Sequence, residues 1–174
     1  MKIENISIVG TPDIRPLNQM TYTITKAEME SEGRSIPNRE ELEIDEKESL
    51  YWITLSKFEV HLTIDGKWKH FSFDRGFVYD LMSCPKIIRW VADESDQRGI
   101  IPAAVHDAMF TSHFLDYHTS NEVFRSLLVY SGMPKWLARI YWLGVASPVG
   151  QIMYNKKTIK RANWQLKAFV FEKE

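Results

Sequence analysis

The sequence predicts an α+β fold: a small antiparallel sheet packed by three to four helices, with extended N-terminal and C-terminal arms. Residues 58–73 alternate apolar and polar side chains on either side of Asp65-Gly66, which is the pattern of a β-hairpin. After residue 85, apolar side chains recur instead at helical spacing, in segments separated by proline and glycine. The chain has 174 residues, of which 44% are hydrophobic and 26% charged, and this balance is typical of one globular domain.

Composition divides the chain into three regions. We expect residues 1–49 to form an N-terminal arm and acidic loop, residues 50–150 the core domain, and residues 151–174 a basic C-terminal tail. Two runs rich in β-branched side chains, 6–10 and 20–25, predict short strands in the arm. The acidic stretch 26–48 contains few large apolar residues and is predicted to be a mobile loop or an exposed segment.

The Asp65-Gly66 turn fixes the register of the predicted hairpin. A two-residue turn places four apolar side chains on the face toward the core: Phe58, Val60, Phe71 and Phe73. His61 and His70 then lie opposite each other on the other face, close enough to share a metal ion. Histidine pairs on a sheet face are more often solvated or packed, so this metal site is the less favoured interpretation. Residues 76–80 predict a third strand.

Proline and capping signals mark four helix starts. Pro85, Pro102 and Pro134 each fit a first helical turn, where a missing N–H costs nothing, and the Thr-Ser-Asn-Glu run at 119–122 has the form of a capping box. The Ser131-Gly132 pair is predicted to end the helix that begins at this box. The most apolar window, 136–150, predicts a buried helix broken by Pro148, and it is too short to span a membrane.

The predicted helix from Pro102 carries His106 and Asp107 side by side among small apolar residues. Neighbouring positions on a helix are about 100° apart, so the two side chains do not face each other. They can both ligate one metal ion, or His106 can act as a general base while Asp107 binds a cation that holds the substrate. The alternative is a packing role, in which His106 is a hydrogen-bonded core residue and Asp107 an exposed one.

Two further residues are candidates for the same site. Asp80 ends a predicted strand, and ligand-binding and catalytic carboxylates are common at strand ends. Ser83 follows it, although its simpler role is to cap the helix at Pro85. The candidate catalytic set is therefore His106, Asp107, Asp80 and Ser83. A divalent metal, Zn or Ca, is expected on the first three.

Three motifs occur in order between about 70 and 150: GFVYDLMSCP, IIPAAVHDAMF and SNEVF followed by an aromatic-rich helix. Together they resemble the phage and prophage domain-of-unknown-function family numbered 1353. The first family motif is Thr-Asp-x-x-Ser-x-Pro, which Asp80, Ser83 and Pro85 match while Tyr79 replaces the Thr. The second is an Ala-rich helix with His-Asp-x-x-Tyr, which His106 and Asp107 match while Phe110 replaces the Tyr.

The third family motif is Ala-Asp-x-x-Phe, which Phe124 matches while Asn121 replaces the Asp. The arrangement is also similar, more loosely, to small calcium-dependent bacterial phospholipases. That similarity implies His106 as the base that activates water, Asp107 as a calcium ligand and Asn121 as the residue that orients the histidine. Asn121 can still hydrogen-bond, but it carries no charge.

Two hypotheses of function follow. The first is a phage-encoded, metal-assisted hydrolase that acts in lysis or in penetration of the cell envelope. The second is a virion component of the tail or baseplate without catalytic activity, which would bind other virion proteins or copies of itself. Nucleic acid is not expected as a partner, because the net charge is only -1. The one cysteine, Cys84, allows no internal disulfide, and we expect the protein in the host cytoplasm when it is made and, under the second hypothesis, in the virion.

Overall fold

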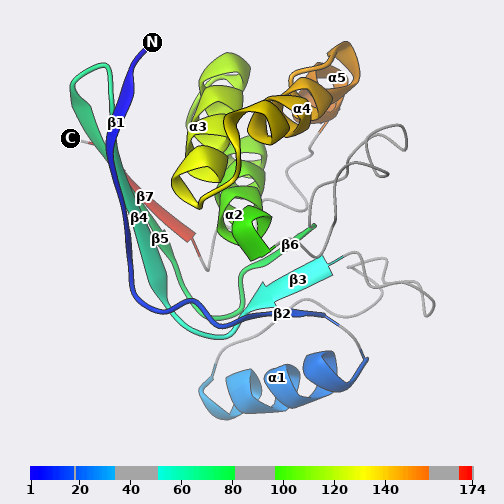
Figure 1. Ribbon diagram of the computed structural model, residues 1–174. Coiled ribbons are helices and arrows are strands. Elements are labelled where there is room, and N and C mark those ends of the chain that lie inside the picture. Colours follow the sequence, from blue (N-terminus) through cyan, green and yellow to red (C-terminus); the bar gives the residue numbers. More distant parts are fainter. Residues whose placement is uncertain (18, 34–50, 81–96, 157–168, 174) are drawn as a thin grey trace.

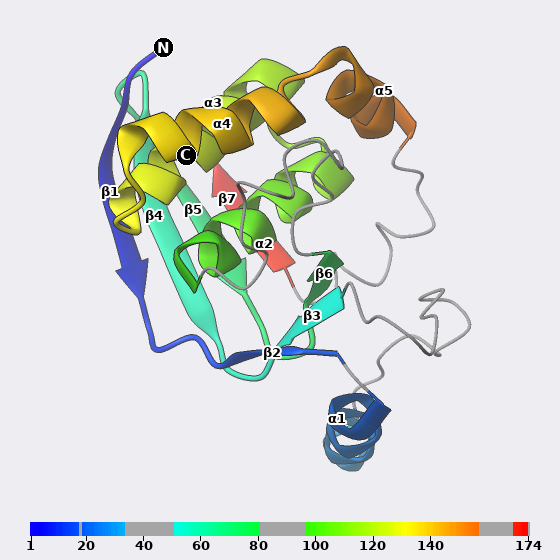
Figure 2. The same cartoon turned by 45° about the vertical axis from the view of Figure 1, so that its right-hand side comes forward.

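The computed structural model describes residues 1–17, 19–33, 51–80, 97–156 and 169–173 (Figure 1, Figure 2). It confirms the predicted α+β class and contains two antiparallel sheets among the described residues. The predicted helix at Pro85, Ser83, Cys84 and most of the acidic stretch lie outside the described residues.

The larger sheet is built on the predicted hairpin. Its strand order is β1 (Ile3–Val9), β4 (Phe58–Ile64), β5 (Lys67–Phe73) and β7 (Phe169–Lys173). The run 6–10 was therefore correctly predicted as extended, and residues from both the N-terminal and the C-terminal region form the edge strands of this sheet.

The register of the hairpin is also as predicted. Phe58 pairs with Phe73, and His61 pairs with His70. The turn holds Asp65 at a φ of 48° and Gly66 at 78°, the left-handed pair that a type I′ turn requires. Because side chains alternate along a strand, this register buries one face of the sheet and leaves both histidines on the other.

The smaller sheet has the order β2 (Ile14–Pro16), β3 (Tyr51–Thr54) and β6 (Val78–Asp80). The helix α1 (Gln19–Ser31) packs against it and lies apart from the other helices (Figure 1). The strand predicted at 20–25 is wrong, because these residues belong to α1. Tyr22, Thr25 and Met29 are all buried, and their spacing is that of a helix face. The burial of this face outweighs the β-propensity of the Thr-Tyr-Thr run. Because α1 extends to Ser31, the first part of the acidic stretch is helical.

Four helices follow: α2 (Gln97–Ser112), α3 (Tyr117–Tyr130), α4 (Lys135–Val145) and α5 (Pro148–Lys156). Two predicted starts are wrong. Pro102 is the sixth residue of α2 and lies beyond the first turn, where a missing N–H costs no intrahelical hydrogen bond. Ile100 and Ile101 pack against the core, and this burial favours the earlier start. α3 begins two residues before the predicted capping box because Asp116 is its N-cap and accepts the Thr119 N–H at 3.0 Å.

The start of α4 after Pro134 and the end of α3 at Ser131 are confirmed. The buried helix predicted at 136–150 is only partly buried, since Trp136 is 62% exposed and Leu143 54% exposed. The break predicted at Pro148 is present, because α4 ends at Val145 and Pro148 begins α5. Among the residues that the structure describes, we find no helix long and apolar enough to cross a membrane.

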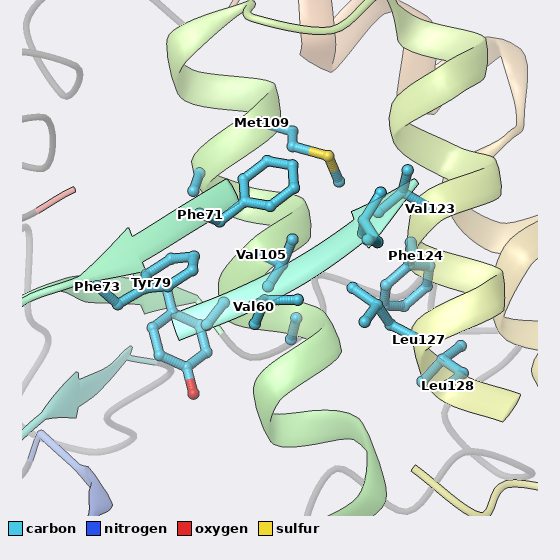
Figure 3. Packing of buried hydrophobic residues seen from close by; sticks show 14 of the residues in the cluster. Val60, Phe71, Phe73, Tyr79, Val105, Met109, Val123, Phe124, Leu127 and Leu128 are labelled. Atoms are coloured by element: carbon cyan, nitrogen blue, oxygen red, sulfur yellow. The ribbon is translucent and has the colours of Figure 1, made fainter. Parts of the chain in front are cut away.

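The main core lies between the larger sheet and the helices α2 and α3 (Figure 3). Val60 and Phe71 project from the sheet toward Val105 and Met109 of α2 and toward the apolar face of α3 (Figure 3). Each of these four side chains has no exposed surface, and burial of such a side chain contributes about 1.5–3 kcal/mol. This packing fixes α2 and α3 side by side, and it thereby positions His106.

Candidate functional site

His106 is held between the two central helices. Its Nε2 lies 3.0 Å from Oδ1 of Asn121 on α3. Its ring lies against Phe110, with the ring centroids 4.0 Å apart, and against Phe124 at 4.7 Å. With the proton on Nε2 donated to Asn121, the lone pair of the imidazole lies on Nδ1. The geometry thus sets the orientation and the tautomer of the ring, which are the two properties a general base needs.

The packing alternative expects His106 to be buried and Asp107 to be exposed, and the structure shows the reverse. Asp107 is the buried member, at 6% exposure, whereas His106 is half-buried. A carboxylate is rarely buried to this degree unless it is paired or serves a function. A buried carboxylate beside a hydrogen-bonded histidine fits a packing role as well as a chemical one.

Aromatic side chains surround this pair of helices. The hydroxyl of Tyr117 is 2.8 Å from the carbonyl oxygen of Val145 and 2.8 Å from that of Ser147. Burial raises the pKa of Tyr117, and its contact with the Asn121 amide opposes this change. Tyr154 of α5 packs edge-on to Phe110, at a centroid distance of 5.0 Å. Tyr154 thus joins α5 to Phe110, and aromatic rings form part of the surroundings of His106.

Asp80 is the last residue of β6, as predicted, and pairs in register with Tyr51. Its side chain and Ser83 lie outside the described residues, so their convergence with His106 stays a prediction. The strand does contact α2: the Tyr79 hydroxyl donates to the carbonyl oxygen of Ile100 at 3.2 Å. β6 thus packs beside the first turns of the helix that carries His106.

A second group of polar side chains lies on the other face of the larger sheet. Oε2 of Glu59 is 3.3 Å from Nε2 of His61 and 3.2 Å from Nε2 of His70. These three side chains can each offer one ligand atom to a metal ion, and the three atoms all lie within 4.8 Å of one another. All three belong to the described part of the chain. The sequence predicted the two histidines as neighbours but missed Glu59. Its position two residues before His61 in the same strand was the available signal, because i and i+2 share a face.

Electrostatics keep Glu59 ionised. The hydrogen-bonded Lys57, whose Nζ lies 2.9 Å from Oε1, lowers the pKa of Glu59 to about 2, against the opposing effect of burial, and His61 adds to the lowering. Lys57 thereby occupies one carboxylate oxygen while the other faces the two histidines. The carboxylate is oriented before any ligand arrives.

A groove of about 450 Å³ lies between β1 and α3. Its lining includes Ile3, Ile6, Arg125 and Lys135, and no residue of either group described above. It therefore contributes nothing to the chemistry at His106 or at Glu59.

Comparison with known proteins places part of the chain in a family. A family model described as a protein of unknown function, DUF1353, matches residues 53–145. This range contains both His106 with Asn121 and the Glu59, His61 and His70 group. Neither a curated protein nor a solved structure matches the chain.

Proposed function

The chain belongs to the DUF1353 family of proteins of unknown function, and from the geometry at His106 we propose that it is a hydrolase in which His106 activates water. The observation that supports the proposal most directly is the 3.0 Å contact between His106 Nε2 and Asn121 Oδ1. It fixes the ring on a partly exposed part of α2, beside the buried carboxylate of Asp107. An oriented imidazole with partial access to solvent is the arrangement that a general base needs.

The proposed chemistry is general-base hydrolysis of an ester. Nδ1 of His106 takes a proton from water as the water oxygen bonds to the carbonyl carbon of the substrate. The imidazolium then returns that proton to the leaving alkoxide as the ester bond breaks. Asn121 holds the ring throughout, but as a neutral amide it stabilises the imidazolium less than a carboxylate does. We therefore expect slow catalysis.

The role of a divalent metal ion at His106, Asp107 and Asp80 belongs to the same proposal. The described residues supply two of these three donors, which is too few for a closed ligand set. The proposed reaction therefore includes no metal step, and Ser83 has no part in it. Given the resemblance to phage and prophage proteins, we place such a hydrolase in lysis or in penetration of the cell envelope.

One observation favours a second candidate function, a non-catalytic component of the virion. Large apolar side chains are exposed on α4 and α5: Trp136, Leu143, Val149, Ile152 and Met153. Within each helix their spacing places them on a common face. Exposed apolar faces of this kind are typical of surfaces that bind another protein. Under this proposal the partner is another virion protein or a second copy of the chain.

The decisive experiment compares the wild-type protein with His106→Gln and Asn121→Asp. Glutamine cannot act as a base, whereas aspartate restores the charge that stabilises an imidazolium. Ester hydrolysis is measured on nitrophenyl esters and phosphatidylglycerol vesicles, and cleavage of peptidoglycan is measured separately, each with and without added Ca²⁺ or Zn²⁺. We expect the Asn121→Asp variant to be at least about tenfold faster than wild type, and the His106→Gln variant to be inactive.

Equal rates in all three proteins on every substrate, at the level of the buffer, would refute the hydrolase. The virion proposal makes a different prediction. Replacement of Trp136 by serine should leave any hydrolysis unchanged and should abolish self-association in sedimentation or incorporation into particles. A monomeric wild-type protein that is absent from particles would refute it.

A further inference from the structure

We propose that Glu59, His61 and His70 form a binding site for a zinc-type divalent cation on the face of the larger sheet opposite to the helices. The proposal is independent of His106. It rests on three ligand atoms that converge: Oε2 of Glu59 and Nε2 of both histidines.

The distances between these atoms already match a coordination polyhedron. Ligands bound at about 2.1 Å to a tetrahedral zinc ion lie about 3.4 Å from one another. Oε2 of Glu59 lies 3.3 Å from His61 Nε2 and 3.2 Å from His70 Nε2. The two imidazole nitrogens are within 4.8 Å of each other. Closing the separation of the two imidazole nitrogens by at most about 1.4 Å therefore completes three corners of the tetrahedron.

The chemistry of the donors selects the class of cation. Two imidazole nitrogens and one carboxylate oxygen suit Zn²⁺ and its transition-metal neighbours. Ca²⁺ and Mg²⁺ require shells made of oxygen, which this group does not supply. Three protein ligands also leave a fourth tetrahedral position for water, as in zinc sites that bind or activate small molecules.

The sheet places these ligands on rigid strands. His61 and His70 are paired across β4 and β5, and Glu59 precedes His61 by two residues on the same face. The side chains are partly accessible, with exposures of 25% for Glu59, 27% for His61 and 14% for His70. Lys57 binds the outer carboxylate oxygen at 2.9 Å and leaves Oε2 directed at the histidines. The same side chains without a metal form an ion pair, and the test separates these two interpretations.

Trp68 gives the site a spectroscopic reporter. Its ring centroid lies 5.5 Å from that of His61 and 5.4 Å from that of His70. Co²⁺ in place of Zn²⁺ should quench the fluorescence of this tryptophan at close range. Trp68→Phe removes the reporter and leaves all three ligands in place.

The experiment titrates the chelator-treated full chain with Zn²⁺ by calorimetry and with Co²⁺ by fluorescence and visible absorption. We expect one equivalent of Zn²⁺, a tetrahedral Co²⁺ spectrum and quenching that is lost in Trp68→Phe. His61→Gln, His70→Gln and Glu59→Gln should each weaken binding by at least about tenfold. His118→Gln is the matched control, because His118 lies on α3, and it should bind as the wild type does.

Either of two results of the Zn²⁺ titration would overturn the proposal: no saturable Zn²⁺ binding by the wild type, or Zn²⁺ binding that both His61→Gln and His70→Gln retain. If a ligand variant fails to fold by circular dichroism, the Trp68→Phe comparison decides, because it removes no ligand. Quenching by Co²⁺ that persists unchanged in Trp68→Phe would place the metal elsewhere. The metal content of a His106→Ala variant should equal that of the wild type.

Discussion

Replacement of Asn121 by aspartate is the most informative single change, because it tests the coupling between α2 and α3 without any assay of activity. The new carboxylate would lie 3.0 Å from Nε2 of His106, at a position only 1% exposed. An opposite charge this close typically shifts a pKa by about 1–3 units. A rise of about two units in the pKa of His106 corresponds to about 2.7 kcal/mol.

The sign of the pH dependence follows from the direction of that shift. The folded-state pKa of His106 in the variant would lie above the unfolded value of about 6.5. The stabilisation is therefore complete below about pH 6.5 and is lost as the pH rises through about 8.5. Relative to wild type, we expect the unfolding free energy of Asn121→Asp to be about 2–3 kcal/mol larger at about pH 5.5 than at about pH 9, so that the variant is the more stable at the lower pH.

Urea denaturation of both proteins across this pH range measures the effect. The control is Asn121→Asp combined with His106→Gln, which removes the titrating partner and should remove the pH dependence. A stability difference that stays constant with pH, or one that persists in the double variant, would refute the coupling of these two residues.

Three further predictions concern stability. Glu59→Gln should reduce the pH dependence of stability between about pH 4.5 and pH 2, because the lowered pKa of Glu59 gives stabilisation that is present above its unfolded value and lost as the pH falls. Acid titrations of both proteins followed by circular dichroism check this. Asp116→Ala should cost about 1 kcal/mol, since it removes the N-cap of α3, and Asp116→Asn, which keeps the cap, should cost less in urea denaturation. Tyr79→Phe should cost about 1 kcal/mol through the lost hydrogen bond to Ile100, and an unchanged midpoint of denaturation would contradict it.

The sequence predicted best where local chemistry leaves little choice. The Asp65-Gly66 turn fixed the register of β4 and β5, because only a type I′ turn suits that pair, and the apolar alternation then assigned the faces. The opposition of His61 and His70 followed from the same register. The contact between His106 and Asn121 was implied by the resemblance, and helix spacing alone could not have paired residues on different helices.

The sequence predicted worst where tertiary burial competes with local signals. The run 20–25 has high β-propensity, yet Tyr22 and Met29 are buried on one face of a helix that packs against the smaller sheet. Pro102 suggested a helix start, but the burial of Ile100 and Ile101 extends α2 backwards past it. In both cases the deciding partner is distant in the sequence, so no local pattern contained it.

The two candidate sites can be tested separately because the larger sheet lies between them. Val60 and Phe71 face α2 and α3, and the residues that alternate with them on β4 and β5 include Glu59, His61 and His70. A direct contact between the metal ligands and His106 is therefore excluded by this layer of buried side chains. If hydrolysis were lost both in His106→Gln and in His61→Gln while both proteins remained folded, the larger sheet would have to couple the sites. Loss in His106→Gln alone, with metal content intact, would instead assign catalysis to the helical face and leave the cation a separate role.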